Sequence, residues 1–163
     1  MLRIDDTGPQ LTESDVSNFE VCCGLTLPKD FKSFLLQFNG GRPTPDTIRI
    51  GQELGNMDAG AAADLPGKTN VDTIFGLRDP MVSCNLDWNF ATFKERLRNL
   101  PNVLLPIACD SGGSIFCLTL SEESKGRIVY CDLECVFAKY GTVPGLYEVA
   151  ASFEEFLSSL KDD

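Results

Sequence analysis

Apolar residues recur at helical spacing in the segment LTLPKDFKSFLLQFNGG, residues 25–41, which therefore has one hydrophobic face. That face consists of large side chains at positions i, i+3, i+4 and i+7: Phe31, Phe34, Leu35 and Phe38. Lysine, serine and glutamine occupy the other positions, as expected for the solvent side of a helix. The pattern predicts an amphipathic core helix that carries no catalytic residue.

Both ends of this helix have their own sequence signals. Pro28 suits the first helical position, because its missing N–H would have no intrahelical partner there. Asp30 lies in the first turn, where the helix dipole favours a negative charge. We expect the helix to end in a left-handed turn that it carries to the protein surface. The residues that tolerate the positive φ of this turn are Asn39, Gly40 and Gly41.

Three other segments have helical periodicity. A first helix is predicted to follow the capping residue Thr12 and to end at Gly24. A central helix spans residues 86–100, with Trp88 off its apolar stripe. A C-terminal helix begins with the capping box SFEE. The residues that define this last helix are Ser152, Phe153 and Phe156.

Three apolar runs of strand length lie in the second half of the chain: residues 103–108, 115–120 and 127–133. Short stretches rich in turn residues, CDSGGS and SEESKG, separate them, so the strands have to pair as an antiparallel meander. Pro106 lacks a donor, which places it at a sheet edge, a strand end or a bulge, and Gly113 belongs to the first turn. Further strands are expected near residues 46–50, 71–77 and 146–150.

Helices at the start, middle and end of the chain, with hairpin-connected strands between them, indicate an α+β fold. We expect an antiparallel sheet, including the meander of the C-terminal half, packed against the N-terminal, central and C-terminal helices. A chain of 163 residues has the length of one domain, so residues 1–163 are predicted to form a single unit. The glycine-rich segment at about residues 51–68 is aperiodic and predicts a flexible surface loop.

The chain is acidic, with 24 Asp and Glu residues against 14 Lys and Arg residues and a formal net charge of −10. Such a surface repels nucleic-acid phosphates and anionic membranes, and it favours a basic protein partner. The start MLRIDDTGPQ lacks the features of a secretory signal, and no apolar run reaches membrane-spanning length. We therefore expect a cytoplasmic protein that binds another protein, with no nucleic acid, membrane or small-molecule substrate.

Catalytic and metal-binding patterns are weak in this sequence. Its cysteines number seven and are scattered, and it has no histidine, which removes Ser–His and Cys–His nucleophile pairs. Reduced thiols are expected, without a disulfide, a cofactor or a zinc site at Cys131 and Cys135. The glycines after Asp110 join two strands, which indicates a hairpin turn and not a phosphate-binding loop. Asp110, Asp132 and Glu134 are expected to converge at one end of the meander, which leaves a carboxylate–metal hydrolase as a distant alternative.

Four blocks of the sequence resemble, in order, the signatures of the SUKH superfamily, also called the Smi/Knr family. The blocks are LTLPKDFKSFLLQFNGG, LLPIACDSGGSIFCLTL, GRIVYCDLE and YEVAASFEEFL. With the first helix, the resemblance extends over residues 11–160. The chain departs from the family pattern in the insertion at residues 51–68 and in Ser114, where many relatives have aspartate. The resemblance implies the α+β fold of a binding module.

The resemblance also implies a function. Bacterial members are mostly immunity proteins that neutralise toxin domains, many of them nucleases, whereas fungal members are regulatory scaffolds linked to cell-wall synthesis. An immunity protein is the first hypothesis, because its acidic charge suits a basic toxin, and a scaffold that binds a protein or peptide is the alternative. The contact residues expected first are Asp110, Asp132 and Glu134, followed by Glu53, Asp58 and Asp64 of the loop.

Overall fold

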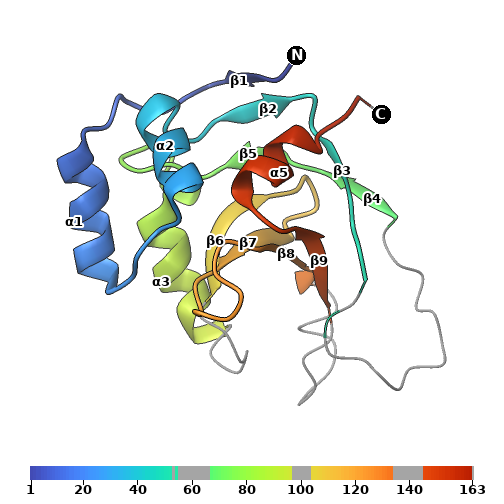
Figure 1. The fold of residues 1–163 in the computed structure, drawn as a ribbon. Coiled ribbons are helices and arrows are strands. Elements are labelled where there is room, and N and C mark those ends of the chain that lie inside the picture. The colour runs from blue at the N-terminus through green and yellow to red at the C-terminus, as the bar shows by residue number, and fades with distance from the viewer. Residues whose placement is uncertain (53, 55–66, 97–103, 134–144, 163) are drawn as a thin grey trace.

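The computed structural model describes residues 1–52, 54, 67–96, 104–133 and 145–162, and Figure 1 shows their arrangement. The helices are α1 (Glu13–Cys23), α2 (Lys29–Gln37), the 3₁₀ helix η1 (Val82–Cys84), α3 (Leu86–Arg96) and α5 (Phe153–Ser158). The strands are β1 (Arg3–Asp5), β2 (Arg42–Thr44), β3 (Thr47–Arg49), β4 (Lys68–Asn70), β5 (Thr73–Ile74), β6 (Leu104–Cys109), β7 (Ile115–Thr119), β8 (Ile128–Cys131) and β9 (Leu146–Ala150). This order confirms the predicted α+β class.

The main sheet has five antiparallel strands in the order β5-β6-β7-β8-β9, so each strand pairs with its neighbour in sequence. Cys117 of β7 lies opposite Pro106 of β6 on one side and Val129 of β8 on the other. The predicted meander is thus confirmed, and β9 adds the expected later strand. The register shifts between Pro106 and Ala108, which confirms the irregularity predicted at the proline.

Two short strand pairs, β1–β2 and β3–β4, lie beside the main sheet (Figure 1). An isolated bridge between Gly41 and Ile74 joins the chain before β2 to β5. A second bridge, between Thr47 and Lys161, joins β3 to the segment after α5. The last residues of the described chain are thereby fixed beside a strand from its first third.

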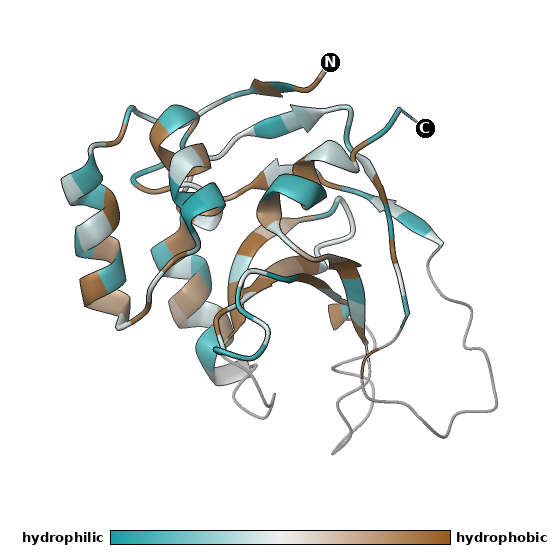
Figure 2. Cartoon of the chain, in the orientation of Figure 1, coloured by the Kyte–Doolittle hydropathy of each residue, from teal (hydrophilic) through white to brown (hydrophobic). Residues whose placement is uncertain are grey.

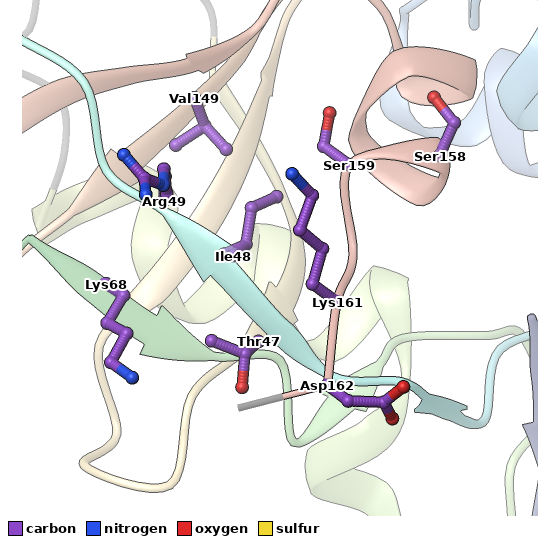
Figure 3. A pocket seen from close by; sticks show the side chains of 9 residues that line it. All are labelled: Thr47, Ile48, Arg49, Lys68, Val149, Ser158, Ser159, Lys161 and Asp162. Carbon is purple, nitrogen blue, oxygen red and sulfur yellow. The ribbon is translucent and has the colours of Figure 1, made fainter.

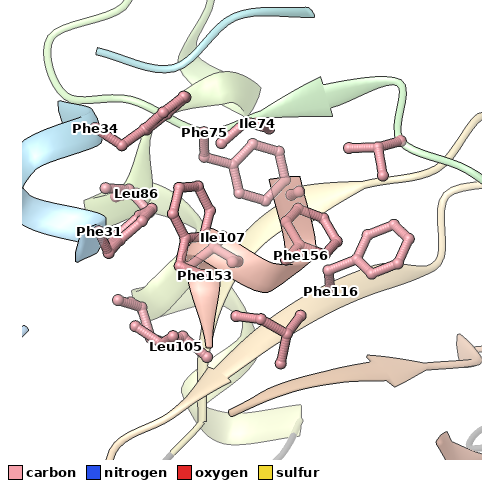
Figure 4. Packing of buried hydrophobic residues seen from close by; sticks show 14 of the residues in the cluster. Phe31, Phe34, Ile74, Phe75, Leu86, Leu105, Ile107, Phe116, Phe153 and Phe156 are labelled. Atoms are coloured by element: carbon pink, nitrogen blue, oxygen red, sulfur yellow. The ribbon is translucent and has the colours of Figure 1, made fainter. Parts of the chain in front are cut away.

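Apolar side chains cover both faces of the meander, and Figure 2 shows hydrophobic residues concentrated along its strands. On the face toward α2 and α5, Phe116 contacts Phe156 with ring centroids 5.4 Å apart (Figure 4). Phe31 of α2 contacts Phe153 of α5 in the same cluster, at 4.8 Å. The other face has a smaller cluster that includes Phe93, Ile115, Cys117 and Val129. Alternation along each strand produces the two clusters.

Helix α2 has the predicted apolar face, but it begins one residue later than expected. Pro28 is the N-cap, with an extended conformation (φ −60°, ψ 150°), so its prediction as the first helical residue is wrong. The reason is its ψ angle, because a helical residue needs a negative ψ. Phe31, Phe34 and Leu35 are buried, whereas Phe38 at the C-cap is half-buried.

Asp30 acts at the start of two helices, because it lies in the first turn of α2, as predicted, and also reaches α5. Its carboxylate accepts hydrogen bonds from the N–H of Phe153 at 2.9 Å and from the next N–H of α5 at 3.2 Å. Ser152 accepts from the N–H of Glu155 at 3.1 Å, as the capping box predicts. The reciprocal bond to the Glu155 carboxylate comes from Ala151, one residue earlier than expected. The start of α5 is therefore fixed by its own cap and by α2.

The turn after α2 is buried, which corrects the prediction that it reaches the surface. Asn39 has φ 54° and is 1% exposed, and Gly40 and Gly41 follow with φ of 82° and 118°. The Asn39 amide donates to the carbonyls of Pro9 at 2.7 Å and Leu77 at 2.8 Å, and accepts from the Leu77 N–H at 2.7 Å. A Cβ on Gly40 would come within 2.8 Å of backbone atoms at β5. The turn therefore joins the N-terminal segment to the chain after β5.

Parts of three predicted elements lie outside the described residues. They are most of the glycine-rich loop (53 and 55–66), the end of the central helix (97–100) and the first residue of the strand predicted at 103–108. Trp88 lies near the start of α3 and is 44% exposed, in agreement with its position off the apolar stripe. Within the described ranges, no helix has the length and apolar character needed to cross a membrane.

Candidate partner-binding surface

A groove of about 550 Å³ lies between the start of α3, β5 and the end of the sheet where β6 turns into β7. Its lining combines exposed or partly exposed charged side chains, buried aromatic and aliphatic side chains, and two partly buried thiols. We call it the acidic groove. The residues that give it this character are Asp6, Arg42, Asp72, Asp79, Met81 and Trp88.

The segment from Asp79 to Asn85 forms one wall of the groove and is held by hydrogen bonds to its backbone. The buried Asn85 side chain accepts from the Asp79 N–H at 2.8 Å and donates to the Asp79 carbonyl at 2.9 Å. The Asp79 carboxylate accepts from the Met81 N–H at 2.7 Å. Asn89 of α3 donates to the Ser83 carbonyl at 2.9 Å. These bonds fix the backbone conformation of the wall.

The fixed wall presents apolar side chains to solvent. Met81 and Val82 are 62% and 58% exposed, and the partly exposed Trp88 lies on the adjoining helix. Burial of such a side chain contributes about 1.5–3 kcal/mol, which these residues forgo in the isolated chain. Tryptophan and methionine are enriched in the buried centres of protein interfaces. Met81 and Trp88 line the acidic groove, whereas Val82 follows Met81 in the sequence and does not line it; we call these three residues the apolar patch.

Carboxylates line the same groove. Arg42 lies between Asp6 and Asp72, with nitrogen–oxygen distances of 4.0 and 3.8 Å. These side chains are all well exposed, so water screens the pairs and they contribute little to stability. With Asp79, the described lining has three carboxylates against one guanidinium. The groove therefore has a net negative charge beside apolar side chains.

Two thiols in the groove are poor nucleophiles. Burial raises the pKa of Cys109 to about 11, and the charge of Asp72 adds to the effect. Burial also raises the pKa of Cys84, with the charge of Asp79 as the next cause. Because the thiolate is the reactive form, these groups are almost entirely unreactive thiols at neutral pH.

Metal ligands do not gather in the part of the chain that the structure describes, where no group of three His, Cys, Asp or Glu residues is placed to hold an ion. The described cysteines are unbridged. Cys131 is buried, which raises its pKa to about 12, and Cys135 lies outside the described residues.

Asp110 organises the hairpin turn between β6 and β7, which confirms the turn prediction. One carboxylate oxygen accepts from two N–H groups of its own turn, both at 2.9 Å. The other accepts from the hydroxyls of Tyr130 at 2.7 Å and Thr69 at 3.1 Å. Asp110 is only 7% exposed, so its expected role as a direct contact residue has to be corrected. The turn itself is exposed and borders the acidic groove through Gly113, whose φ is 88°.

Asp132 lies at the same end of the sheet as Asp110. It follows β8, whose residue Cys131 pairs with Ile115 of β7. Burial raises the pKa of Tyr130, and both aspartates add to that effect. The predicted convergence therefore holds for these two carboxylates. The other predicted contact residues, Glu134, Glu53, Asp58 and Asp64, lie outside the described residues.

The apolar patch is the part of the site that sequence reasoning missed. Met81 and Val82 occupy the stretch DPMVSCN, where two adjacent apolar residues create no helical or strand period. The available signal was a pair of large apolar residues between turn-forming residues, followed by Trp88 off the helix stripe. Such residues have no place in a core and are candidates for an interface.

The fold and the groove define an α+β domain with a surface suited to protein binding. Residues 10–159 match the SMI1 / KNR4 family (SUKH-1), and the chain belongs to this family. The family includes toxin-immunity proteins, and its domains are generally non-catalytic and often bind protein toxins. The chain is also similar to the uncharacterized SPbeta prophage-derived protein YokK of Bacillus subtilis (strain 168), with 26% identity over 157 residues. That alignment covers 93% of this chain and 76% of the relative.

Proposed function

We propose that this chain is a single-domain immunity protein that binds a toxin domain in the cytoplasm and neutralises it by covering its active surface. The observation that carries the proposal is the apolar patch, held outward by a fixed loop beside the carboxylates of one groove. Membership of a family that includes toxin-immunity proteins supports it. Occlusion requires binding alone, so the chain needs no catalytic group.

The expected partner is a basic protein domain such as a nuclease. Nucleases bind phosphates through clustered Lys and Arg, and a chain with a net charge of −10 meets such a cluster at a raised rate. Once the surfaces meet, Met81 and Trp88 supply buried apolar contacts that slow dissociation. The charge therefore acts mainly on the association rate, and the apolar patch acts on the dissociation rate.

The direct test is co-expression of this chain with the C-terminal domain encoded by the neighbouring gene, measured as growth. We expect the domain alone to stop growth and the chain to restore it. A domain that is harmless alone, or that stays lethal while the chain is abundant and folded, refutes the immunity role. A pull-down from native lysate then tests the scaffold alternative.

The double variant Met81→Ser, Trp88→Ala tests the apolar patch. Loss of a central aromatic anchor costs about 2 kcal/mol or more, which is roughly 30-fold in affinity. Val21→Ser on α1 is the matched control, because Val21 is 80% exposed and does not line the groove. We expect lost rescue for the double variant only, with native melting temperatures for both proteins. Full rescue by the double variant would contradict the assignment of the patch.

The double variant Asp6→Asn, Asp72→Asn tests the charge of the groove. Asp6 has φ 51°, which asparagine also tolerates, so the change removes charge with little strain. Glu122→Gln, Glu123→Gln makes the same change of charge in the exposed turn between β7 and β8. We expect the groove variant to lower the association rate more than the control, and salt to slow wild-type association far more than it speeds dissociation. An association rate that does not change with salt concentration would contradict electrostatic steering.

A further inference from the structure

A second hollow, of about 450 Å³, lies between β3, β4 and the segment after α5 (Figure 3). It shares no described lining residue with the acidic groove. Its charged lining residues are Arg49, Lys68, Lys161 and Asp162, and the hydroxyl of Ser159 adds a donor. We call it the cationic pocket, because it gathers basic side chains in an acidic protein.

Strand pairing places these cations on adjacent extended segments. Arg49 of β3 lies directly opposite Lys68 of β4 in the antiparallel register. On the other side of β3, Lys161 pairs with Thr47, and the two residues exchange backbone hydrogen bonds of 3.1 and 2.9 Å. Thr47 and Arg49 are two residues apart and share one face of β3. The register therefore places Arg49 and Lys161 on the same face, and in Figure 3 both side chains extend in one direction, whereas that of Lys68 points the other way.

No carboxylate of the pocket is directed at Arg49. Arg49 and Lys68 hold paired positions, but in Figure 3 the Lys68 ammonium group points away from the Arg49 guanidinium, so the two charges do not face each other. Lys161 follows α5, whose C-terminal carbonyl groups favour a cation, so its own position has a local explanation. That explanation does not extend to Arg49. In Figure 3 the carboxylate of Asp162 points away from Arg49, so it does not neutralise the guanidinium.

Several other cations of the described chain have carboxylate partners. Such pairs include Arg3–Asp5, Lys32–Glu20, Arg78–Asp15, Lys125–Glu122 and Arg127–Glu148. Arg49 and Lys161, by contrast, form no ion pair within the described ranges, although the chain carries ten more negative than positive charges. The pocket's one described carboxylate, Asp162, forms no ion pair with Arg49 or Lys161, so an external anion is a favourable counter-charge for these two cations.

We propose that the cationic pocket binds the phosphate group of a small phosphorylated molecule of about mononucleotide size. A phosphate carries more than one charge and accepts hydrogen bonds in several directions, which suits the guanidinium fork of Arg49 and the ammonium group of Lys161. Ser159 can donate to the same group. The pocket volume falls in the range of small-molecule sites, and Ile48 and Val149 add apolar contacts for the rest of the ligand.

The test is a titration of the isotope-labelled full chain, followed by nuclear magnetic resonance at constant ionic strength. The probes are inorganic phosphate, adenosine monophosphate and succinate, the last as a dicarboxylate without phosphorus. We expect saturable binding of both phosphates, with a dissociation constant of about 1 mM or tighter for the nucleotide. Equal or tighter binding of succinate overturns the phosphate assignment, and the absence of saturation by either phosphate overturns the site.

Charge-removing variants locate the binding. Arg49→Gln and Lys161→Gln should each weaken phosphate binding at least about fivefold. Lys125→Gln is the matched control, since it removes one exposed positive charge outside the pocket and should leave affinity unchanged. Equal affinity in all three variants would show general ionic attraction and would refute the pocket.

A thermal measurement separates binding from folding. In low-salt buffer without phosphate, Arg49→Gln should melt no lower than the wild type, because Arg49 is exposed and forms no ion pair with the described residues. Phosphate should raise the melting temperature of the wild type and leave that of Arg49→Gln nearly unchanged. A variant that is destabilised without phosphate, or that phosphate stabilises as much as the wild type, contradicts the proposal.

Discussion

Replacing Asn39 by alanine removes a side chain that joins three segments of the fold. The side-chain amide makes three hydrogen bonds, one with Pro9 and two with Leu77, at 2.7–2.8 Å. A net contribution of about 1 kcal/mol for each bond gives a loss of about 3 kcal/mol. The N–H of Leu77 then stays in a buried residue without its acceptor, which adds to the loss.

The backbone of Asn39 contributes a second effect that can be measured separately. Its φ of 54° strains alanine by about 1–2 kcal/mol but does not strain glycine. Glycine, in turn, gives the unfolded chain more conformational freedom, which lowers the free energy of unfolding by about 0.4–1 kcal/mol. We therefore expect Asn39→Ala to lower the free energy of unfolding by roughly 4 kcal/mol. The loss for Asn39→Gly should be smaller than this by roughly 0.5–1 kcal/mol.

Chemical denaturation followed by far-UV circular dichroism measures both losses, provided that the denaturant slope is unchanged. Asn18→Ala is the control, because Asn18 is an exposed asparagine of α1, and we expect a change within about 0.5 kcal/mol. A loss below about 1 kcal/mol for Asn39→Ala would refute the hydrogen-bond reasoning. A glycine variant less stable than the alanine variant would refute the backbone reasoning.

Phe34→Ala should lower the free energy of unfolding by about 3–5 kcal/mol, because Phe34 is buried and its ring lies 5.0 Å from that of Phe153. A loss below about 1 kcal/mol in denaturation would show that this helix face is not core. Asp15→Asn should lower stability at neutral pH, because hydrogen bonds from the Thr12 backbone and then its side chain hold the pKa of Asp15 below its usual 3.8. This stabilisation is present above the usual pKa and is lost as the pH falls through the lower folded-state pKa. Stability measured against pH should therefore converge for wild type and variant in acid, and parallel curves would contradict the assignment.

Periodicity predicted the elements whose determinants are local. A repeat of 3.6 or two residues reports which side of one element faces the core, and this placed α2 and the strands β6, β7 and β8 correctly. The cap of α1 was predictable for the same reason. Thr12 and Asp15 bond reciprocally across three residues, and Gly24 ends the helix in a left-handed conformation. Each of these signals lies within a few residues of the feature that it predicts.

Long-range partners decide the features that the sequence did not predict. Asn39 was expected at the surface, but its side-chain partners lie 30 and 38 residues away in the sequence. Asp110 was expected to be exposed, but Tyr130 and Thr69 reach it from 20 and 41 residues away. The acidic groove likewise combines the N-terminal segment, β5 and the start of α3. A periodic pattern within one element carries no information about contacts between segments that are far apart in the sequence.

The family signature and the apolar patch occupy different parts of the chain, although signature residues such as Gly41 and Gly113 also line the acidic groove. The signature blocks include Asn39, Asp110 and Ser152, whose side chains bond to the protein's own backbone at two turns and a helix start. The apolar patch lies in residues 81–88, between the blocks, on a loop that hydrogen bonds to Asn85 hold in place and on the start of α3. We therefore expect substitution of the outward side chains to alter binding with little effect on the fold, and substitution in the signature to alter the fold. Under the proposed immunity function, this separation would let one scaffold serve different partners, as immunity to a particular toxin requires.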